Sequence, residues 1–262
     1  MSFARLDVFG SVTLAWLEEG KAYPLLSGSF FGAHDIGKTP LPEPFSFLAP
    51  IEPVAVWAVG LNYASHIKEM GKSLPKHPEV FMKSPLALQH PLGPIILPRV
   101  AREVDFEGEL AVVIGKKGKN IPAEKALDHV LGYTCALDIT SRDWQREGSQ
   151  WVRAKSFDTF LPLGPVVVPA SALDPRDMAI TTWVNEEKFQ EGRTKDMIFS
   201  VAQVISFLSE STTLVPGMVV LTGTPPGVGA GRHPPRWLKA GDMVRLEIKG
   251  IGVLEHPVVD EE

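Results

Sequence analysis

The sequence predicts a β-rich α+β fold, and three observations support this class. Most of the elements that it predicts are strands, and only two segments, 123–130 and 195–210, have convincing helical character. The chain also contains 23 glycines and 23 prolines, many of them clustered, which is typical of shaped loops between strands. A length of 262 residues is enough to bury a sizeable core in one large domain or two modest ones.

The strand pattern suggests a small N-terminal unit followed by a larger one. Short strands are expected at 5–10 and 12–25, with a turn at Glu19-Gly20. The proline-rich passage 38–53 breaks regular structure, so we place a boundary there between a small N-terminal β subdomain, 1–48, and a catalytic domain, 49–262. Further strands are expected at 54–60, 79–84, 109–115, 130–140, 164–169, 179–185, 218–223 and 243–255.

Apart from 123–130, helix signals occur in the short segment 61–71 and in the longer segment 195–210. In the short segment 61–71, Asn62 suits an N-cap and Gly71 suits the end of a helix, and a polar, proline-broken loop follows. In 195–210, apolar residues recur at helical spacing and are expected to face the core. These residues are Ile198, Ala202, Ile205 and Leu208.

Composition excludes several classes of partner. The formal net charge of −5 and a pI near 5.8 provide no basic field for nucleic acid or an anionic membrane. The single Cys135 cannot form an intramolecular disulfide and is expected to be a small buried hydrophobe, which fits a reducing compartment. No signal peptide and no apolar run of membrane-spanning length is evident, so we expect a cytoplasmic protein.

The stretch 105–110, DFEGEL, places carboxylates at every second position and then runs into apolar residues. In a strand, Asp105, Glu107 and Glu109 would point to the same face. On a solvated face, the ordinary interpretation, each neighbouring pair would repel by only about 0.6 kcal/mol, but at the effective dielectric of a protein by about 2.5 kcal/mol. If the trio is partly buried, it therefore needs a compensating positive charge.

Asp138 adds a carboxylate at the end of a stretch of uncharged residues, and an unpaired buried aspartate is rare. Carboxylate oxygens suit a hard divalent cation such as Mg²⁺, Mn²⁺ or Ca²⁺ better than Zn²⁺. The acidic residues are therefore candidates for a metal site.

Other clusters also suggest chemistry. His66 and Glu69, three residues apart, would share one helix face, where a carboxylate can orient an imidazole as a general base; incidental surface polarity is the alternative. Lys155 precedes an apolar-rich stretch, where it either extends to the surface or binds an anion in a pocket.

The glycine-rich segment 222–231, TGTPPGVGAG, lacks the Lys-Ser/Thr of a phosphate-binding loop and is not followed by a helix. Pro225 and Pro226 also lack backbone donors. We expect a shaped loop between strands, with the Thr222 and Thr224 hydroxyls available to a ligand.

Taken together, several stretches resemble the fumarylacetoacetate hydrolase family, in the family's order and over roughly residues 54–258. They are VGLNYASHIKEMG, DFEGELAVVIGK, GYTCALDITSRDWQ, RAKSFDTFLPLGP, QEGRTKDMIFS and VLTGTPPGVG. Within the family the chain is most similar to bacterial 2-hydroxyhepta-2,4-diene-1,7-dioate isomerases. The resemblance implies a mixed β-sandwich roll, a homodimer, and a Mg²⁺ or Mn²⁺ ion (with Ca²⁺ as a substitute in crystals) that chelates a small 2-oxo or 2-enol acid.

The resemblance also implies roles for particular residues. It assigns the metal to Glu107, Glu109 and Asp138, with Asp105 as a neighbouring group. It assigns catalysis to the lid dyad His66 and Glu69 and to Lys155, and substrate binding to Gln145 and Thr224. One departure is Leu137, where many members have Asn, and this weakens any transfer of substrate specificity.

The same apparatus serves three reactions. We expect isomerisation of a 2-hydroxy-dienoate, with decarboxylation as an accompanying activity. Hydrolysis of an acylpyruvate or fumarylacetoacetate-type C–C bond and decarboxylation of oxaloacetate are the alternatives. A metal-binding scaffold without turnover is a further alternative, against which the presence of His66, Glu69 and Lys155 argues.

Overall fold

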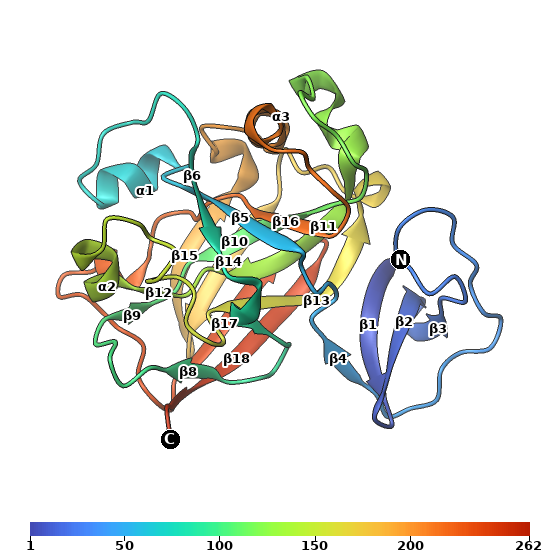
Figure 1. Ribbon diagram of the computed structural model, residues 1–262. Helices are drawn as coiled ribbons and strands as arrows, with labels where there is room; N and C mark the ends of the chain where they lie inside the picture. Colours follow the sequence, from blue (N-terminus) through green and yellow to red (C-terminus); the bar gives the residue numbers. More distant parts are fainter.

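The computed structural model describes residues 1–262 and consists mainly of two packed β-sheets (Figure 1). The large sheet contains β1 (Ser2–Val8), β2 (Ser11–Glu18), β3 (Lys21–Pro24), β4 (Ser46–Leu48), β5 (Ala55–Gly60), β6 (Glu79–Lys83), β7 (Leu88–Gln89), β10 (Gly108–Ile114), β11 (Val130–Leu137), β13 (Leu161–Pro169) and β16 (Met218–Leu221). The second sheet contains β8 (Ile95–Leu97), β14 (Ala179–Val184), β15 (Glu187–Arg193), β17 (Met243–Ile248) and β18 (Gly252–Asp260). A separate pair is formed by β9 (Val104–Asp105) and β12 (Thr140–Ser141).

Strand order confirms the predicted β-rich, mixed architecture. The large sheet runs β3-β2-β1-β13-β11-β10-β16-β5-β6, and the second runs β15-β14-β17-β18-β8. The pairs β16–β5, β13–β7 and β18–β8 are parallel, and the other pairs are antiparallel. The apolar runs of the sequence therefore correspond to strands that are paired on both sides.

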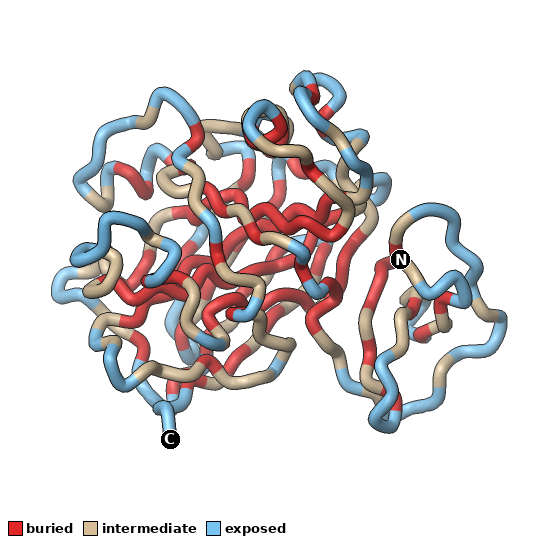
Figure 2. Tube along the Cα trace, in the orientation of Figure 1, coloured by how far each residue is buried: buried red, intermediate tan, exposed pale blue.

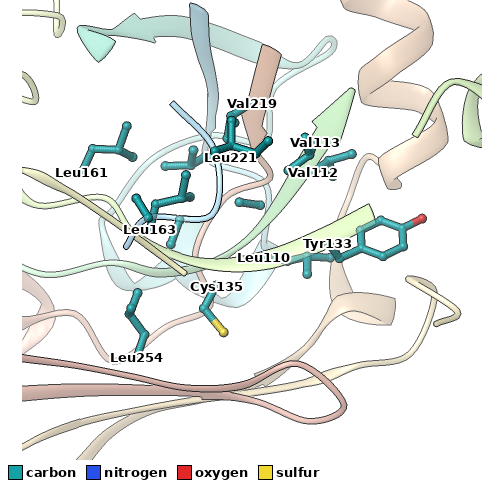
Figure 3. Packing of buried hydrophobic residues seen from close by; sticks show 14 of the residues in the cluster. Leu110, Val112, Val113, Tyr133, Cys135, Leu161, Leu163, Val219, Leu221 and Leu254 are labelled. Carbon is teal, nitrogen blue, oxygen red and sulfur yellow. The ribbon is translucent and has the colours of Figure 1, made fainter. Parts of the chain in front are cut away.

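The core is one cluster of 55 buried hydrophobic residues to which both sheets contribute. Every residue of β10 is buried, because neighbouring elements cover both faces of this central strand, and its sequence is accordingly a continuous apolar run after Glu109. Figure 2 shows buried backbone concentrated in the central strands. Figure 3 shows Leu161, Leu163 and Cys135 of the large sheet above Leu254 of the second. Cys135 is fully buried, as expected for a small core residue.

The N-terminal strands lie to one side of this body (Figure 1). β1, β2 and β3 form an antiparallel meander, and Glu19 and Gly20, with φ of 49° and 76°, form the predicted turn between β2 and β3. β1 also pairs with β13, with Phe3 opposite Val167, so the N-terminal strands continue the large sheet.

The α-helices are α1 (Ala64–Glu69), α2 (Arg142–Glu147) and α3 (Val201–Ser211). Short 3-10 turns are η1 (Pro85–Ala87), η2 (Ala123–His129), η3 (Ala170–Ala172), η4 (Thr194–Asp196) and η5 (Gly229–Gly231). None of the helices has the length and apolar character that crossing a bilayer requires.

Several helix predictions were wrong in detail. Asn62 does not cap α1, whose N-cap is Tyr63; instead the Asn62 amide bonds the backbone of Phe199 and Thr222. The predicted helical segment 123–130 is helical over Ala123–His129, as the 3-10 helix η2, and Val130 already belongs to β11. α3 starts only at Val201, because Ser200 and Gln203 form a capping box there.

The expected apolar stripe was also partly wrong. Ile198 lies before α3, and Ala202 is only partly buried, whereas Val201 and Val204 join Ile205 and Leu208 in the buried face. The helix α2 had no counterpart among the predicted elements.

A buried histidine gives the fold a predictable response to acid. The His256 ring is fully buried, Nδ1 lies 2.7 Å from the Gly93 carbonyl oxygen, and Nε2 has no partner. Burial lowers the pKa of His256 to about 4. Between this value and the ordinary pKa of about 6.5, the unfolded chain binds a proton that the folded chain refuses, so stability falls as pH falls.

We therefore expect wild type to lose about 2 to 3 kcal/mol of unfolding free energy through this histidine between pH 7.5 and pH 4.5. His256→Asn keeps an N–H donor toward Gly93 and removes the titration, so its loss over the same range should be smaller by that amount. Urea unfolding at both pH values measures the difference. Parallel losses in the two proteins would show that His256 does not contribute.

Candidate active site

Three acidic side chains meet at one edge of the large sheet. Glu109 lies in β10, Glu107 directly precedes β10, and Asp138 directly follows β11. Because the strands are antiparallel neighbours, with Gly108 opposite Leu137, the start of β10 lies beside the end of β11. The Asp138 N–H donates to the Glu107 carbonyl at 2.8 Å. One carboxylate oxygen from each of the three side chains lies within 4.8 Å of the others.

Burial makes this cluster electrostatically demanding. The three residues have exposed fractions of 6% (Glu107), 1% (Glu109) and 0% (Asp138). Burial, together with the charges of Asp138 and Glu107, raises the pKa of Glu109 well above its ordinary value. Burial also raises the pKa of Glu107, but Lys155 and Arg142 outweigh it and hold that pKa well below its ordinary value.

The cluster has the chemistry of a divalent metal site. Its donors are all carboxylate oxygens, which hard cations prefer, and a divalent cation would relieve the repulsion that raises the pKa of Glu109. The residues present therefore fit a divalent ion. Glu107, Glu109 and Asp138 would hold it.

Lys155 binds two of these carboxylates. Its Nζ donates to Glu107 Oε2 at 2.8 Å, to Asp138 Oδ2 at 2.5 Å and to Thr140 Oγ1 at 2.9 Å. The side chain is almost completely buried, so it does not extend to the surface. Burial alone would lower the pKa of Lys155, but Asp138 and Glu107 raise it, so the group carries a fixed positive charge.

Lys83 is a second buried cation, and sequence reasoning missed it. It ends β6, and its Nζ donates to Asp138 Oδ1 at 2.5 Å and to the Ile139 carbonyl at 3.3 Å. Burial lowers the pKa of Lys83, and the charge of Asp138 opposes this. Asp138 thus lies between two ammonium groups, one on each carboxylate oxygen. The signal in the sequence was a lysine within the otherwise apolar stretch VFMK.

Arg142, at the start of α2, was also missed and organises the other side of the cluster. Its Nη2 donates to Glu107 Oε1 at 2.6 Å, its Nε donates to Asp105 Oδ2 at 2.9 Å, and its Nη1 donates to Gln145 Oε1 at 3.0 Å. The stretch 105–110 is not one strand, because β9 ends at Asp105 and β10 begins only at Gly108. Asp105 therefore orients Arg142 and does not join the three carboxylates.

The glycine-rich segment 222–231 does more than connect strands. Its backbone N–H groups donate to three carboxylates: Gly223 to Glu109 Oε2 at 2.6 Å, Gly227 to Glu69 Oε1 at 2.9 Å, and Gly229 and Ala230 to Asp105 at 2.8 and 3.0 Å. The expectation of a loop with free threonine hydroxyls was thus incomplete.

Glycine is required in this loop because the packing is close. Gly227 has a φ of +105°, and a Cβ there would lie 1.9 Å from the Phe189 carbonyl oxygen. At Gly231, a Cβ would lie 2.4 Å from Cδ of Glu69. A side chain at Gly227 would displace the loop backbone, and a side chain at Gly231 would displace the Glu69 carboxyl group.

His66 and Glu69 form the expected pair on α1. The His66 Nδ1 lies 3.0 Å from Glu69 Oε2. Because a carboxylate only accepts, Nδ1 of His66 carries the hydrogen of this bond, and in the neutral ring Nε2 is the nitrogen with a free lone pair. His66 is buried, with 5% exposed, and lines the same cavity as the acidic cluster. Nε2 is therefore the atom that can take a proton from a ligand.

The two predicted substrate-binding residues also line this cavity. Gln145 is positioned by Arg142. The Thr224 hydroxyl donates to the Gly108 carbonyl at 3.0 Å and accepts from Gln190 Nε2 at 2.7 Å, which leaves one lone pair for a ligand. The Thr222 hydroxyl is occupied by the Leu110 carbonyl.

The cavity has a volume of about 530 Å³, within the range of about 300–1,000 Å³ typical of small-molecule sites. Glu107, Glu109 and Lys155 line its buried inner end, and residues with more exposure, such as the half-buried Phe81 and Trp151 and the exposed Lys72, line the rest. All the predicted site residues except Glu69 and Asp138 are among the lining residues; Glu69 reaches the cavity through His66, and Asp138 through Lys155.

Removing one partner of the Lys83–Asp138 pair should destabilise the protein strongly. We expect Lys83→Met to cost about 3 to 5 kcal/mol, because a buried carboxylate loses a charged partner. Lys188→Met, the same change in the exposed pair Lys188–Glu191, should cost less than about 1 kcal/mol. Urea unfolding measures both, and the double variant Lys83→Met/Asp138→Asn should cost less than the sum of its single changes. Equal small costs for the two methionine variants would contradict this account.

Comparisons with known proteins identify the family to which this chain is similar. The profile of the family described as fumarylacetoacetate (FAA) hydrolase C-terminal matches residues 55–259. A protein named oxaloacetate tautomerase fahd2, mitochondrial, from Xenopus laevis is 48% identical over 218 residues, which are 82% of this chain and 68% of that protein.

Two solved structures match over the whole chain. One is described as 5-carboxymethyl-2-hydroxymuconate delta-isomerase from Mycobacterium smegmatis, with a TM-score of 0.90, 37% identity and 100% of both chains covered. The other is described as 2-hydroxyhepta-2,4-diene-1,7-dioate isomerase from Mycobacterium marinum, with a TM-score of 0.89, 37% identity, and 100% of this chain and 99% of that chain covered. From its sequence, its fold and these matches, the chain belongs to the fumarylacetoacetate hydrolase family.

Proposed function

We propose that this protein is a divalent-metal-dependent tautomerase that interconverts the keto and enol forms of 2-oxo acids. Its substrates would be oxaloacetate and longer unsaturated acids such as 2-hydroxyhepta-2,4-diene-1,7-dioate. The observation that carries the proposal is that Glu107, Glu109, Lys155 and the imidazole of His66 line one cavity. The similar proteins support it, because their names describe a tautomerase and two isomerases, and each of these reactions includes such a proton shift.

The proposed reaction moves one proton between carbon 3 and the 2-oxo oxygen, and different residues of the chain have different roles in it. A bound divalent ion would supply Lewis-acid polarisation of the 2-oxo group and charge for the neighbouring carboxylate. Lys155 places a fixed positive charge at the inner end of the cavity, where negative charge develops on oxygen. Nε2 of His66 takes the proton from carbon 3, and Glu69 stabilises the imidazolium that forms. The imidazolium then gives up this proton, directly or through a water molecule, to the 2-oxo oxygen, which yields the enol and restores the neutral imidazole.

Three further points stay predictions: that the ion is magnesium or manganese, that the protein is a homodimer, and that it is located in the cytoplasm. The oxygen-only ligand set supports a hard cation. The homodimer follows from the family resemblance alone. The name of the Xenopus relative places that protein in mitochondria.

The proposal is tested with oxaloacetate and Mg²⁺, by following the loss of enol absorbance in the ultraviolet. Metal-dependent interconversion without release of pyruvate or of cleaved acids supports a tautomerase. Pyruvate and CO₂ as the main products would indicate a decarboxylase. Cleavage of an acylpyruvate would indicate the C–C hydrolase, and tight Mg²⁺ binding without turnover of any 2-oxo acid would indicate a scaffold.

Removal of the proposed base should separate catalysis from metal binding. We expect His66→Ala to lower kcat by about 10²- to 10⁴-fold, the usual contribution of a general base. Mg²⁺ affinity, measured by titration calorimetry, should stay close to that of wild type, because His66 donates no hydrogen bond to the acidic cluster. His129→Ala, a histidine outside the cavity, is the control and should leave both values unchanged. Equal losses of activity and Mg²⁺ affinity in His66→Ala would refute the assignment.

Removal of a proposed metal-binding side chain should weaken Mg²⁺ binding first, and activity should be lost as a consequence. Glu107→Ala should lose Mg²⁺ affinity by more than the roughly 10- to 100-fold cost of changing an outer-shell partner, and activity should fall with it. Circular dichroism confirms that the variant is folded, since Arg142 and Lys155 each lose a partner. A Glu107→Ala protein that is fully active in the presence of a chelator would exclude Glu107 as a ligand.

A further inference from the structure

Two aromatic side chains, Phe81 and Trp151, line one side of the cavity next to its charged inner end, and we call them the aromatic wall. The Lys155 ammonium lies 4.9 Å from the centre of the Phe81 ring. The Phe81 ring meets the Trp151 indole edge-to-face, with centroids 5.4 Å apart and planes at 72°. The indole in turn reaches Gly60 at the end of β5. All four residues line the same cavity.

Position 60 requires glycine because of steric contact with the Trp151 indole, and not because of its backbone conformation. Its φ lies outside the left-handed range, so other residues could adopt the backbone conformation. A Cβ at Gly60, however, would lie 2.7 Å from Cζ3 and 3.3 Å from Cη2 of Trp151. The absence of a side chain at Gly60 therefore creates the space that the indole occupies.

The wall offers a particular kind of binding surface. Ring faces and edges of Phe81 and Trp151 favour flat groups with π electrons, and such contacts contribute about 0.5 to 1.5 kcal/mol each beyond area burial. The inner end of the cavity is polar and charged, and it suits the carboxylate and 2-oxo group. A four-carbon acid held at that end would leave much of the cavity of about 530 Å³ unfilled.

We infer that Trp151, seated against Gly60, is a specificity-determining residue that selects 2-oxo acids with a flat, unsaturated or aromatic group beyond carbon 4. This inference rests on the proposed function, because it assumes that the 2-oxo end binds beside the acidic cluster. Trp151 makes no contact with the reacting atoms and acts on the far end of the substrate. Extended substrates gain binding energy from it that oxaloacetate is too short to gain.

Two 2,4-dioxo acids test the inference by binding alone. 2,4-Dioxopentanoate ends in a methyl group, and 4-phenyl-2,4-dioxobutanoate ends in a flat ring, while both carry the same 2-oxo acid end. Calorimetry in the presence of Mg²⁺ gives the ratio of their dissociation constants for each protein. In wild type the phenyl compound should bind more tightly.

The variants are Trp151→Leu, which removes the aromatic surface, and Gly60→Ala, which displaces the indole from its seat. Each should reduce the preference for the phenyl compound by about 2- to 12-fold, the factor that corresponds to one aromatic contact. The matched control is Trp144→Leu. Trp144 lies on α2, with its ring centre 4.0 Å from the Arg153 guanidinium, and it does not line the cavity. The ratio of dissociation constants for this variant should therefore equal that of wild type.

The outcomes distinguish this inference from the proposed function. An unchanged ratio in both variants, or equal binding of the two acids by wild type, overturns the inference even if oxaloacetate is tautomerised. A changed ratio supports the inference even if oxaloacetate is not converted, and then only the reaction has been misassigned. If circular dichroism shows that Trp151→Leu does not fold, the ratio of the two dissociation constants for Gly60→Ala alone tests the inference.

Discussion

The pairing of buried carboxylates with buried cations at the start of β10 is the interaction on which the site depends. Four carboxylates and three cations are packed together there: Asp105, Glu107, Glu109 and Asp138 with Lys83, Arg142 and Lys155. Each carboxylate except Glu109 has at least one of these cations as a partner, and Glu109 accepts a backbone N–H from Gly223 instead. The pKa of Glu109 is raised because burial and the charges of Asp138 and Glu107 outweigh the opposing effects of the Lys155 charge and the Gly223 N–H. A divalent ion at this position would provide the missing positive charge.

The fold places these groups through sheet register more than through loops. Glu107 and Asp138 flank the paired ends of β10 and β11, so a slip of one residue in that pairing would point their side chains to the opposite faces. Such a slip would also move Glu109, the only charged residue of the buried strand β10, away from the backbone N–H of Gly223. The β10–β11 register, together with the hydrogen bonds of these carboxylates, therefore fixes the spacing of the proposed ligands.

Sequence patterns predicted the parts of this design that are local. The apolar runs predicted β5, β10 and β16, and the E-x-E spacing pointed to Glu107 and Glu109. Lys83 and Arg142 were missed because their partners are distant in the chain: Lys83 lies 55 residues from Asp138 and Arg142 lies 35 residues from Glu107. Asn62 was misassigned as a cap for the same reason, since its hydrogen-bond partners lie 137 and 160 residues away.

The loop 222–231 connects the base to the acidic cluster. Gly227 binds Glu69, which orients His66, and Gly223 binds Glu109 only four residues earlier. Because one short segment holds both groups by backbone donors, the distance between the proton acceptor and the proposed ion is set by the protein and not by the ligand. Such preorganisation is what a proton shift next to a polarised carbonyl requires. The inner end is therefore suited to one type of chemistry, and differences in substrate among relatives should arise where the wall is built from side chains alone, at Phe81 and Trp151.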